Sequence, residues 1–204
     1  IPNPKCDFGC AAYCRYADRC LQELPPDVFS GRPDLLRKRA ASEMKRVFGA
    51  DTRRAQHALR VADYAERIAQ QEQADMGVVL IAAYLHDIGI PEAERRYDNP
   101  DEQCHERLGA PAARALLENI GAEAPLIEEV CDIIGRHHRP GPEETINYKA
   151  VYDADLLVNR MQKYADSSQC RDTANDVCAN GFLTEAGKRL AAEVILQNSG
   201  KREV

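Results

Sequence analysis

The segment LIAAYLHDIGI, residues 80–90, ends the most apolar helix that the sequence predicts, Met76 to Ile88. Because this helix is apolar nearly all round, we expect it to lie at the centre of the fold. A histidine and an aspartate, His86 and Asp87, stand next to each other at its C-terminal end. Burying this pair costs free energy unless a partner compensates it.

A divalent cation is a simple partner for such a pair. Imidazole and carboxylate together suit Mn, Fe, Co, Ni or Zn better than Ca or Mg. Both side chains can reach an ion beyond the last helical turn, where Gly89 turns the chain away. Each histidine alone also fits a hydrogen-bonded core position or a polar helix end, so only the joint order of all five indicates a metal site. They are His57, His86, His105, His137 and His138.

The rest of the sequence also predicts helices. Asp51 and Asp75 stand where they can cap the N-termini of two of them, and Thr184 can cap the last. No stretch alternates at period two, so we predict an all-α fold. The expected helices are 34–48, the helix that follows Asp51 and carries His57, 76–88, about 105–120, about 123–138, about 147–165 and about 184–197.

Composition limits the classes of protein that the chain can belong to. The chain has 204 residues and a formal charge of −6, from 33 acidic and 27 basic side chains, which argues against general nucleic-acid binding. No apolar run approaches the roughly 18–20 residues of a membrane span, and the start lacks the apolar stretch of a signal peptide. We therefore expect a cytoplasmic protein, with 1–32 as a Cys-rich N-terminal appendage and 33–204 as one helical domain.

The appendage is defined by its cysteines. Three of them recur every fourth residue, on one face of a helix if the segment is helical, and a fourth follows six residues later. Such thiolates can bind an iron–sulfur cluster or a structural zinc ion. Disulfides, which would indicate an oxidising compartment and could include Cys170 and Cys178, and free thiols remain alternatives. The four cysteines are Cys6, Cys10, Cys14 and Cys20.

Four segments together resemble the HD-domain superfamily of metal-dependent phosphohydrolases, over roughly residues 35–197. The resemblance implies an HD-type helical bundle in which His57, His86, Asp87 and Asp155 bind one metal ion. Asp153 competes for the last position, but Asp155 fits the family pattern better. The segments are QHALRVADYAERIA (56–69), LIAAYLHDIGI (80–90), EEVCDIIGRHHRPG (128–141) and VYDADLLVNRM (151–161).

Two-metal members of this superfamily carry further histidines between the doublet and the last aspartate. By that resemblance His105 and His137 or His138 would bind a second ion, with Glu106 as a substitute for His105. Asp87 would bridge the two ions, and a bridging hydroxide would be available near neutral pH. We therefore count Asp87 and His105 among the predicted catalytic residues.

Arginines lie close in sequence to the predicted ligands, and guanidinium groups suit phosphate oxygens. Of these, Arg60 and Arg139 are the predicted phosphate contacts. The resemblance implies hydrolysis of a phosphomonoester or phosphodiester, for which we expect a small nucleotide-like substrate. Two alternatives remain open, namely a di-iron oxygenase with the same ligand set and a binding or regulatory module without catalytic activity.

Overall fold

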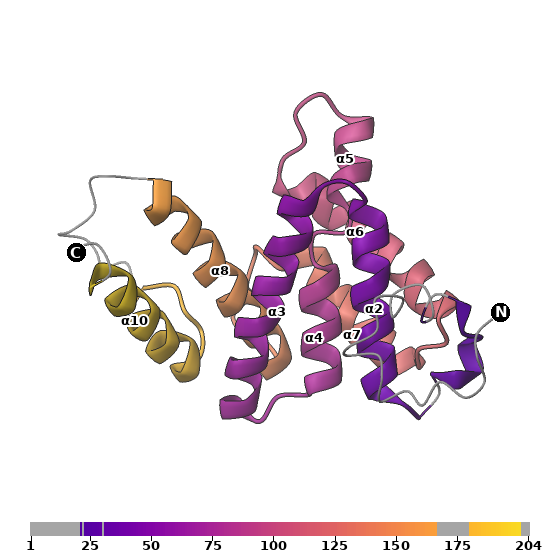
Figure 1. The fold of residues 1–204 in the computed structure, drawn as a ribbon, viewed down its shortest axis with the longest axis horizontal. Helices are drawn as coiled ribbons and strands as arrows, with labels where there is room; N and C mark the ends of the chain where they lie inside the picture. Colours follow the sequence, from indigo (N-terminus) through magenta and orange to yellow (C-terminus); the bar gives the residue numbers. More distant parts are fainter. Residues whose placement is uncertain (1–20, 22, 30, 167–179, 201–204) are drawn as a thin grey trace.

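The chain folds into a helical bundle (Figure 1). The computed structural model describes residues 21, 23–29, 31–166 and 180–200, which contain helices and turns but no strand. The all-α prediction is therefore confirmed. The elements are η2 (Pro26–Val28), α2 (Pro33–Phe48), α3 (Thr52–Glu72), α4 (Met76–Leu85), α5 (Ile90–Arg96), α6 (Glu102–Asn119), α7 (Ala124–Arg136), α8 (Ile146–Asp166) and α10 (Glu185–Gly200).

Helix α4 lies at the centre of the bundle, as predicted. It contacts α2, α3, α7 and α8, and all its residues from Val78 to Ala83, together with Leu85, are buried. Each buried Val, Leu or Ile side chain of this helix contributes roughly 1.5–3 kcal/mol when it leaves water. Asp75 caps the helix by accepting hydrogen bonds from the backbone N–H groups of Gly77 and Val78, at 2.7 and 3.1 Å.

The segment Met76–Arg96 is long and apolar enough, by length and composition, to cross a membrane. The prediction that no apolar run approaches the length of a membrane span is therefore wrong. However, 61% of its most apolar window is buried inside the protein, and the chain turns at residues 86–89, where α4 gives way to α5. Burial within the bundle explains the apolar character of the segment.

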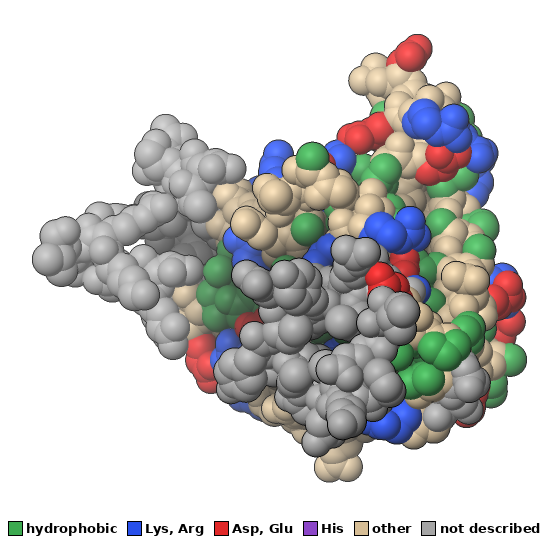
Figure 2. Space-filling view, turned by 45° about the vertical axis from the view of Figure 1, so that its right-hand side comes forward, with side chains coloured by type: hydrophobic (Ala, Val, Ile, Leu, Met, Phe, Trp, Pro, Cys, Tyr) green, Lys and Arg blue, Asp and Glu red, His purple; other side chains and the backbone are tan. Residues whose placement is uncertain are grey.

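The C-terminal end of α4 differs from its prediction. The helix ends at Leu85 rather than Ile88, and a separate helix, α5, begins at Ile90. Pro91 occupies the first turn of α5, where its missing N–H costs nothing. Helix α5 projects from the bundle (Figure 1), and on it Glu92 pairs with Arg95 and Arg96. Figure 2 shows acidic and basic side chains next to one another on this projecting part of the molecule.

Helix α10 is tied to α8 at its N-terminus by Asp153. The buried Asp153 carboxylate accepts hydrogen bonds from the N–H and hydroxyl groups of Thr184, at 2.8 and 2.7 Å. Thr184 in turn caps α10 by accepting from the N–H of Gly187. A Cβ at Gly187 would lie 2.3 Å from Asp153 Oδ2, so only glycine fits there. Asp153 thus takes the role that a glutamate at position 187 would play in a capping box.

Candidate metal centre

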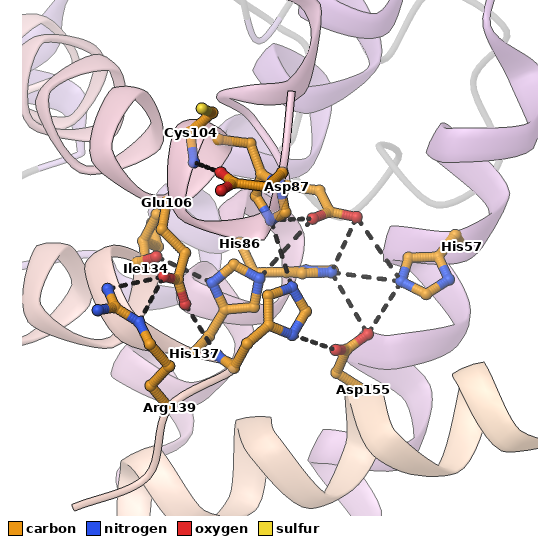
Figure 3. Close-up of polar contacts among 12 residues, drawn as sticks. His57, His86, Asp87, Cys104, Glu106, Ile134, His137, Arg139 and Asp155 are labelled. Carbon is orange, nitrogen blue, oxygen red and sulfur yellow. Dashed lines mark hydrogen bonds and ion pairs between the residues drawn. The ribbon is translucent and has the colours of Figure 1, made fainter. Parts of the chain in front are cut away.

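The ends of several helices bring the predicted ligands together between α3, α6 and α8 (Figure 3). His57 lies on α3, His105 on α6 and Asp155 on α8. His86 and His137 are the C-cap residues of α4 and α7, so each stands at the point where its helix ends. The side chains therefore meet although they are up to 98 residues apart in sequence.

These side chains form two adjoining groups, and within each group one donor atom per residue lies within 4.8 Å of the others. The first group contains His57, His86 and Asp155, and the second contains Asp87, His105, His137 and His138. In the first group, Asp155 Oδ1 lies 3.1 Å from His57 Nε2 and 3.6 Å from His86 Nε2.

Asp87 faces both groups with different oxygens. Its Oδ2 lies 3.3 Å from His86 Nε2 and 3.8 Å from His57 Nε2. Its Oδ1 lies 3.6 Å from His105 Nε2 and 3.8 Å from His137 Nε2. A carboxylate between two sets of imidazoles is placed to bridge two cations.

Gly89 allows α6 to approach Asp87. A Cβ at this position would lie 2.2 Å from the carbonyl oxygen of His105 and 2.5 Å from the backbone nitrogen of Gly109. Only a glycine leaves room for the α6 backbone to pass here. Gly89 therefore does more than end a helix, because it lets His105 stand beside Asp87.

The two deepest histidines are oriented in the same way. His86 Nδ1 lies 2.9 Å from the carbonyl oxygen of Ala83, and His137 Nδ1 lies 2.9 Å from that of Ile134. Since a carbonyl only accepts, each Nδ1 carries the hydrogen, and the neutral ring presents the Nε2 lone pair to the site. Held outer nitrogens of this kind are typical of metal-binding histidines.

Two observations fit a metal ion. His137 is only 1% exposed, and its Nε2 has no hydrogen-bond partner among the described residues. The Nε2 atoms of His57 and His86 lie 3.3 Å apart, as do those of His105 and His138. Metal–nitrogen bonds of about 2.0–2.1 Å in a tetrahedron place two ligands about 3.3 Å apart. The donor set of imidazoles and carboxylates therefore fits divalent transition metals.

The electrostatics of the site also favour a positive charge beside its carboxylates. Burial disfavours the charged ring of His86, yet the carboxylates of Asp87 and Asp155 outweigh it and raise the pKa of His86 to about 9. Burial opposes ionisation of Asp87 too, but His86 and His137 hold its pKa well below the usual value. Burial, with the charge of His137, lowers the pKa of His138 to about 4. The carboxylates of Asp87 and Asp155 therefore stabilise a positive charge next to them.

The two aspartates of α8 have different surroundings. Asp155 reaches the histidines, whereas Asp153 is engaged by Thr184 and by the backbone N–H of Leu183. Glu106, the predicted substitute ligand, points away from the two ligand groups. Its fully buried carboxylate accepts from the N–H of His138 at 3.0 Å and from Arg139 Nε at 2.9 Å (Figure 3).

A cavity of about 710 Å³ opens onto the two groups. Arg60 and Arg139, the predicted phosphate contacts, do not line it, and their role stays a prediction. Arg53 and Lys163 line it instead, and Lys163 was not among the predicted phosphate contacts. Its lining residues are Asp51, Arg53, Arg54, His57, Asp87, Ile90, Glu102, His105, His138, Tyr152, Asp155, Leu156, Asn159, Gln162 and Lys163.

The cysteine predictions concern parts of the chain outside the described residues. Cys6, Cys10, Cys14 and Cys20 all fall there, so the cluster, zinc and disulfide alternatives stay predictions. Cys170 and Cys178 lie outside the described residues as well. The two cysteines of the described bundle, Cys104 and Cys131, are free thiols.

The fold and the site together define a class of protein. It is an all-α bundle in which histidines and aspartates from separate helices form two adjoining groups of potential metal ligands. Comparison with known families makes this specific. The HD domain model matches residues 54–160, just over half of the chain, and the chain belongs to this family. The matched region contains every residue of the two groups.

A solved structure has a similar fold. It is the crystal structure of a protein described as a predicted HD superfamily hydrolase, from an uncultured Thermotogales bacterium. The TM-score is 0.60 with 23% sequence identity, over 80% of this chain and 89% of that chain. This similarity confirms the predicted HD-type fold. No curated protein matches the chain.

Proposed function

We propose that this protein is a metal-dependent hydrolase of a phosphomonoester or phosphodiester, acting on a nucleotide-like substrate. The observation that carries the proposal is the pair of ligand groups, both faced by Asp87, that open onto one cavity. Two divalent ions held there would polarise a phosphoryl oxygen and lower the pKa of a water molecule. Membership of the HD domain family supports this assignment.

In this proposal His57, His86 and Asp155 would hold one ion, and His105, His137 and His138 would hold the other. Asp87, which faces both groups, would be a ligand common to the two. The hydrogen bonds at the outer nitrogens of His86 and His137 keep these rings in place during the reaction. The protein's own contribution is therefore positioning, on which phosphoryl transfer largely depends.

Arg53 and Lys163 are the best placed cations for the substrate phosphate. They line the cavity from α3 and α8, one turn before His57 and two turns after Asp155. Within the described part of the chain, neither is held in an ion pair. Arg54 also lines the cavity, but Asp51 and Glu94 pair with it at 2.8 and 2.5 Å.

The remaining lining suits the organic part of a nucleotide. A volume of about 710 Å³ falls within the range of roughly 300–1,000 Å³ that is usual for small-molecule sites. Tyr152 and Leu156 offer apolar surface, and the amides of Asn159 and Gln162 offer both donors and acceptors. These four residues recur on one side of α8, as Asp155 and Lys163 do.

The test is hydrolysis of a panel of nucleotides and simple phosphate esters by Mn²⁺- or Co²⁺-loaded protein without oxygen. We expect activity that His86→Ala abolishes, and a KM raised about tenfold by Arg53→Met or Lys163→Met, since each removes a phosphate contact. Arg67→Met is the matched control, because Arg67 lies on α3 but pairs with Glu193 away from the cavity. Activity that requires iron and oxygen would overturn the proposal in favour of the oxygenase.

A further inference from the structure

Glu106 and Arg139 form an ion pair between α6 and the end of α7. The side chain of Glu106 is fully buried, whereas that of Arg139 is 55% exposed. Arg139 reaches Glu106 with Nε at 2.9 Å and with a second guanidinium nitrogen at 2.8 Å. Both contacts go to Oε2 of Glu106, so this charge-assisted pairing restrains one oxygen of the buried carboxylate and leaves Oε1 for another donor.

This carboxylate also controls the backbone beside the second ligand group. Its Oε1 accepts from the N–H of His138 at 3.0 Å, and Arg139 donates to the carbonyl oxygen of Gly135 at 3.3 Å. Glu106 and Arg139 therefore close the end of α7 where His137 and His138 leave the helix. Glu106 is adjacent to His105 in sequence, so the same turn of α6 supplies a ligand and a brace for two others (Figure 3).

His138 needs such a brace because it is at the end of a helix and its ring touches both groups. Its Nε2 lies 3.3 Å from His105 Nε2, and its Nδ1 lies 3.8 Å from Asp155 Oδ2. The rings of His86 and His137 are held by backbone carbonyls at Nδ1. Within the described chain, no backbone carbonyl holds a ring nitrogen of His138 in this way. The position of the His138 ring therefore depends on its backbone.

We propose that Glu106 and Arg139 are positioning residues that set the affinity of the second ligand group for its metal ion without binding the ion themselves. The inference rests on the proposed function, because it assumes that this group holds a metal ion. The first group, with His57 and His86, does not contact the ion pair and keeps its affinity when the pair is broken.

The experiment is a Co²⁺ titration of metal-free protein, followed by absorption and by calorimetry. Wild type is expected to bind two equivalents in two phases. Glu106→Gln removes the charge from the pair, and Arg139→Ala removes its exposed partner without burying a new polar group. Each variant is expected to weaken only the second phase, by about 10- to 100-fold.

Arg114 and Glu128 provide a matched control. They also link α6 to α7, through two contacts of 2.7 Å, but they lie on the surface away from the histidines. Glu128→Gln is expected to keep both phases. Circular dichroism identifies any variant that fails to fold, and Arg139→Ala then decides the question alone.

The outcomes separate the two proposals. Two unchanged phases in folded Glu106→Gln and Arg139→Ala would overturn the positioning role while leaving the metal centre intact. Equal weakening of both phases would also overturn it, because the effect would not be confined to one group. Wild-type protein that binds no Co²⁺ would instead overturn the proposed function and, with it, this inference.

Discussion

Replacing Gly89 with alanine tests the geometry of the metal centre most directly. The new Cβ would lie 2.2 Å from the carbonyl oxygen of His105, and Cβ atoms essentially never approach closer than 3.0 Å. The backbone of α6 must therefore retreat by at least about 0.8 Å. The contacted atoms are backbone atoms of a helix, so no side-chain rotation relieves the overlap.

Two effects of this displacement can be measured. Overpacking of this kind costs about 1–3 kcal/mol, so urea unfolding of the metal-free variant should show a loss of that size. The second effect is on metal binding, because His105 moves with α6 while Asp87 remains on the α4 side. Since metal–ligand distances tolerate only about 0.2 Å, we expect Gly89→Ala to lose the second Co²⁺ equivalent and keep the first.

Gly135→Ala is the control for this substitution. Gly135 lies in the last turns of α7, and a Cβ there would meet Ala110 Cβ at 3.5 Å, an ordinary contact. The change should be neutral or stabilise the protein by up to about 1 kcal/mol through helix propensity. The reasoning is refuted if Gly89→Ala binds two Co²⁺ ions with wild-type affinities and unfolds within about 0.5 kcal/mol of wild type.

Four further results are expected. Asp87→Asn should weaken both Co²⁺ phases, because one side chain faces both groups; an effect on a single phase would contradict a bridging role. Between pH 7 and pH 9 the Co²⁺ affinity of the first group should rise about tenfold per pH unit and then level off. The reason is that the ion must displace the proton that His86 binds below its pKa of about 9. A flat profile would show that no proton is released. Asp153→Ala should destabilise the protein by about 2–4 kcal/mol in urea unfolding, because it leaves buried donors without an acceptor, and should keep both Co²⁺ phases. Asp155→Ala should instead weaken Co²⁺ binding by the first group and have the smaller effect on unfolding. His57→Gln should remove one Co²⁺ phase and His105→Gln the other, and loss of the same phase in both variants would mean that the groups hold a single ion.

The helices could be predicted because their signals are local. Asp51 and Asp75 cap the helices that their positions predicted, since a capping side chain bonds only to N–H groups two or three residues ahead. The end of α4 could not be read in this way. Ile88 is apolar and no Gly or Pro lies between Leu85 and Gly89, so the local sequence does not mark the end at Leu85. The chain turns where the backbone of α6, more than ten residues away in sequence, approaches Gly89.

The cavity shows why sequence proximity is a poor guide to phosphate contacts. Arg60 lies one turn after His57, but the cavity is lined by the N-terminal end of α3, so Arg53 faces it and Arg60 does not. Lys163 is eight residues from Asp155 and shares its face of α8. Once Asp155 is known to be a ligand, this spacing predicts that Lys163 lies on the same side of the helix. The pairing of Arg139 with Glu106 joins residues on different helices, and no pattern in one sequence reports it.

The two ligand groups are built on the same plan with one difference. In each, a helix ends in a histidine whose Nδ1 is held by the carbonyl three residues earlier, and the next residue supplies another ligand. After α4 that residue is Asp87, whereas after α7 it is His138. Together with Asp155, Asp87 gives the first group two carboxylates, while the second group shares one carboxylate and otherwise offers neutral imidazoles. Charge would hold an ion in the first group even with imperfect geometry, whereas binding of an ion in the second group, which the first ion would repel, would depend on how accurately its imidazoles are placed. It is beside the second group that the fold places the ion pair of Glu106 and Arg139, whose carboxylate accepts from the backbone N–H of the ligand His138.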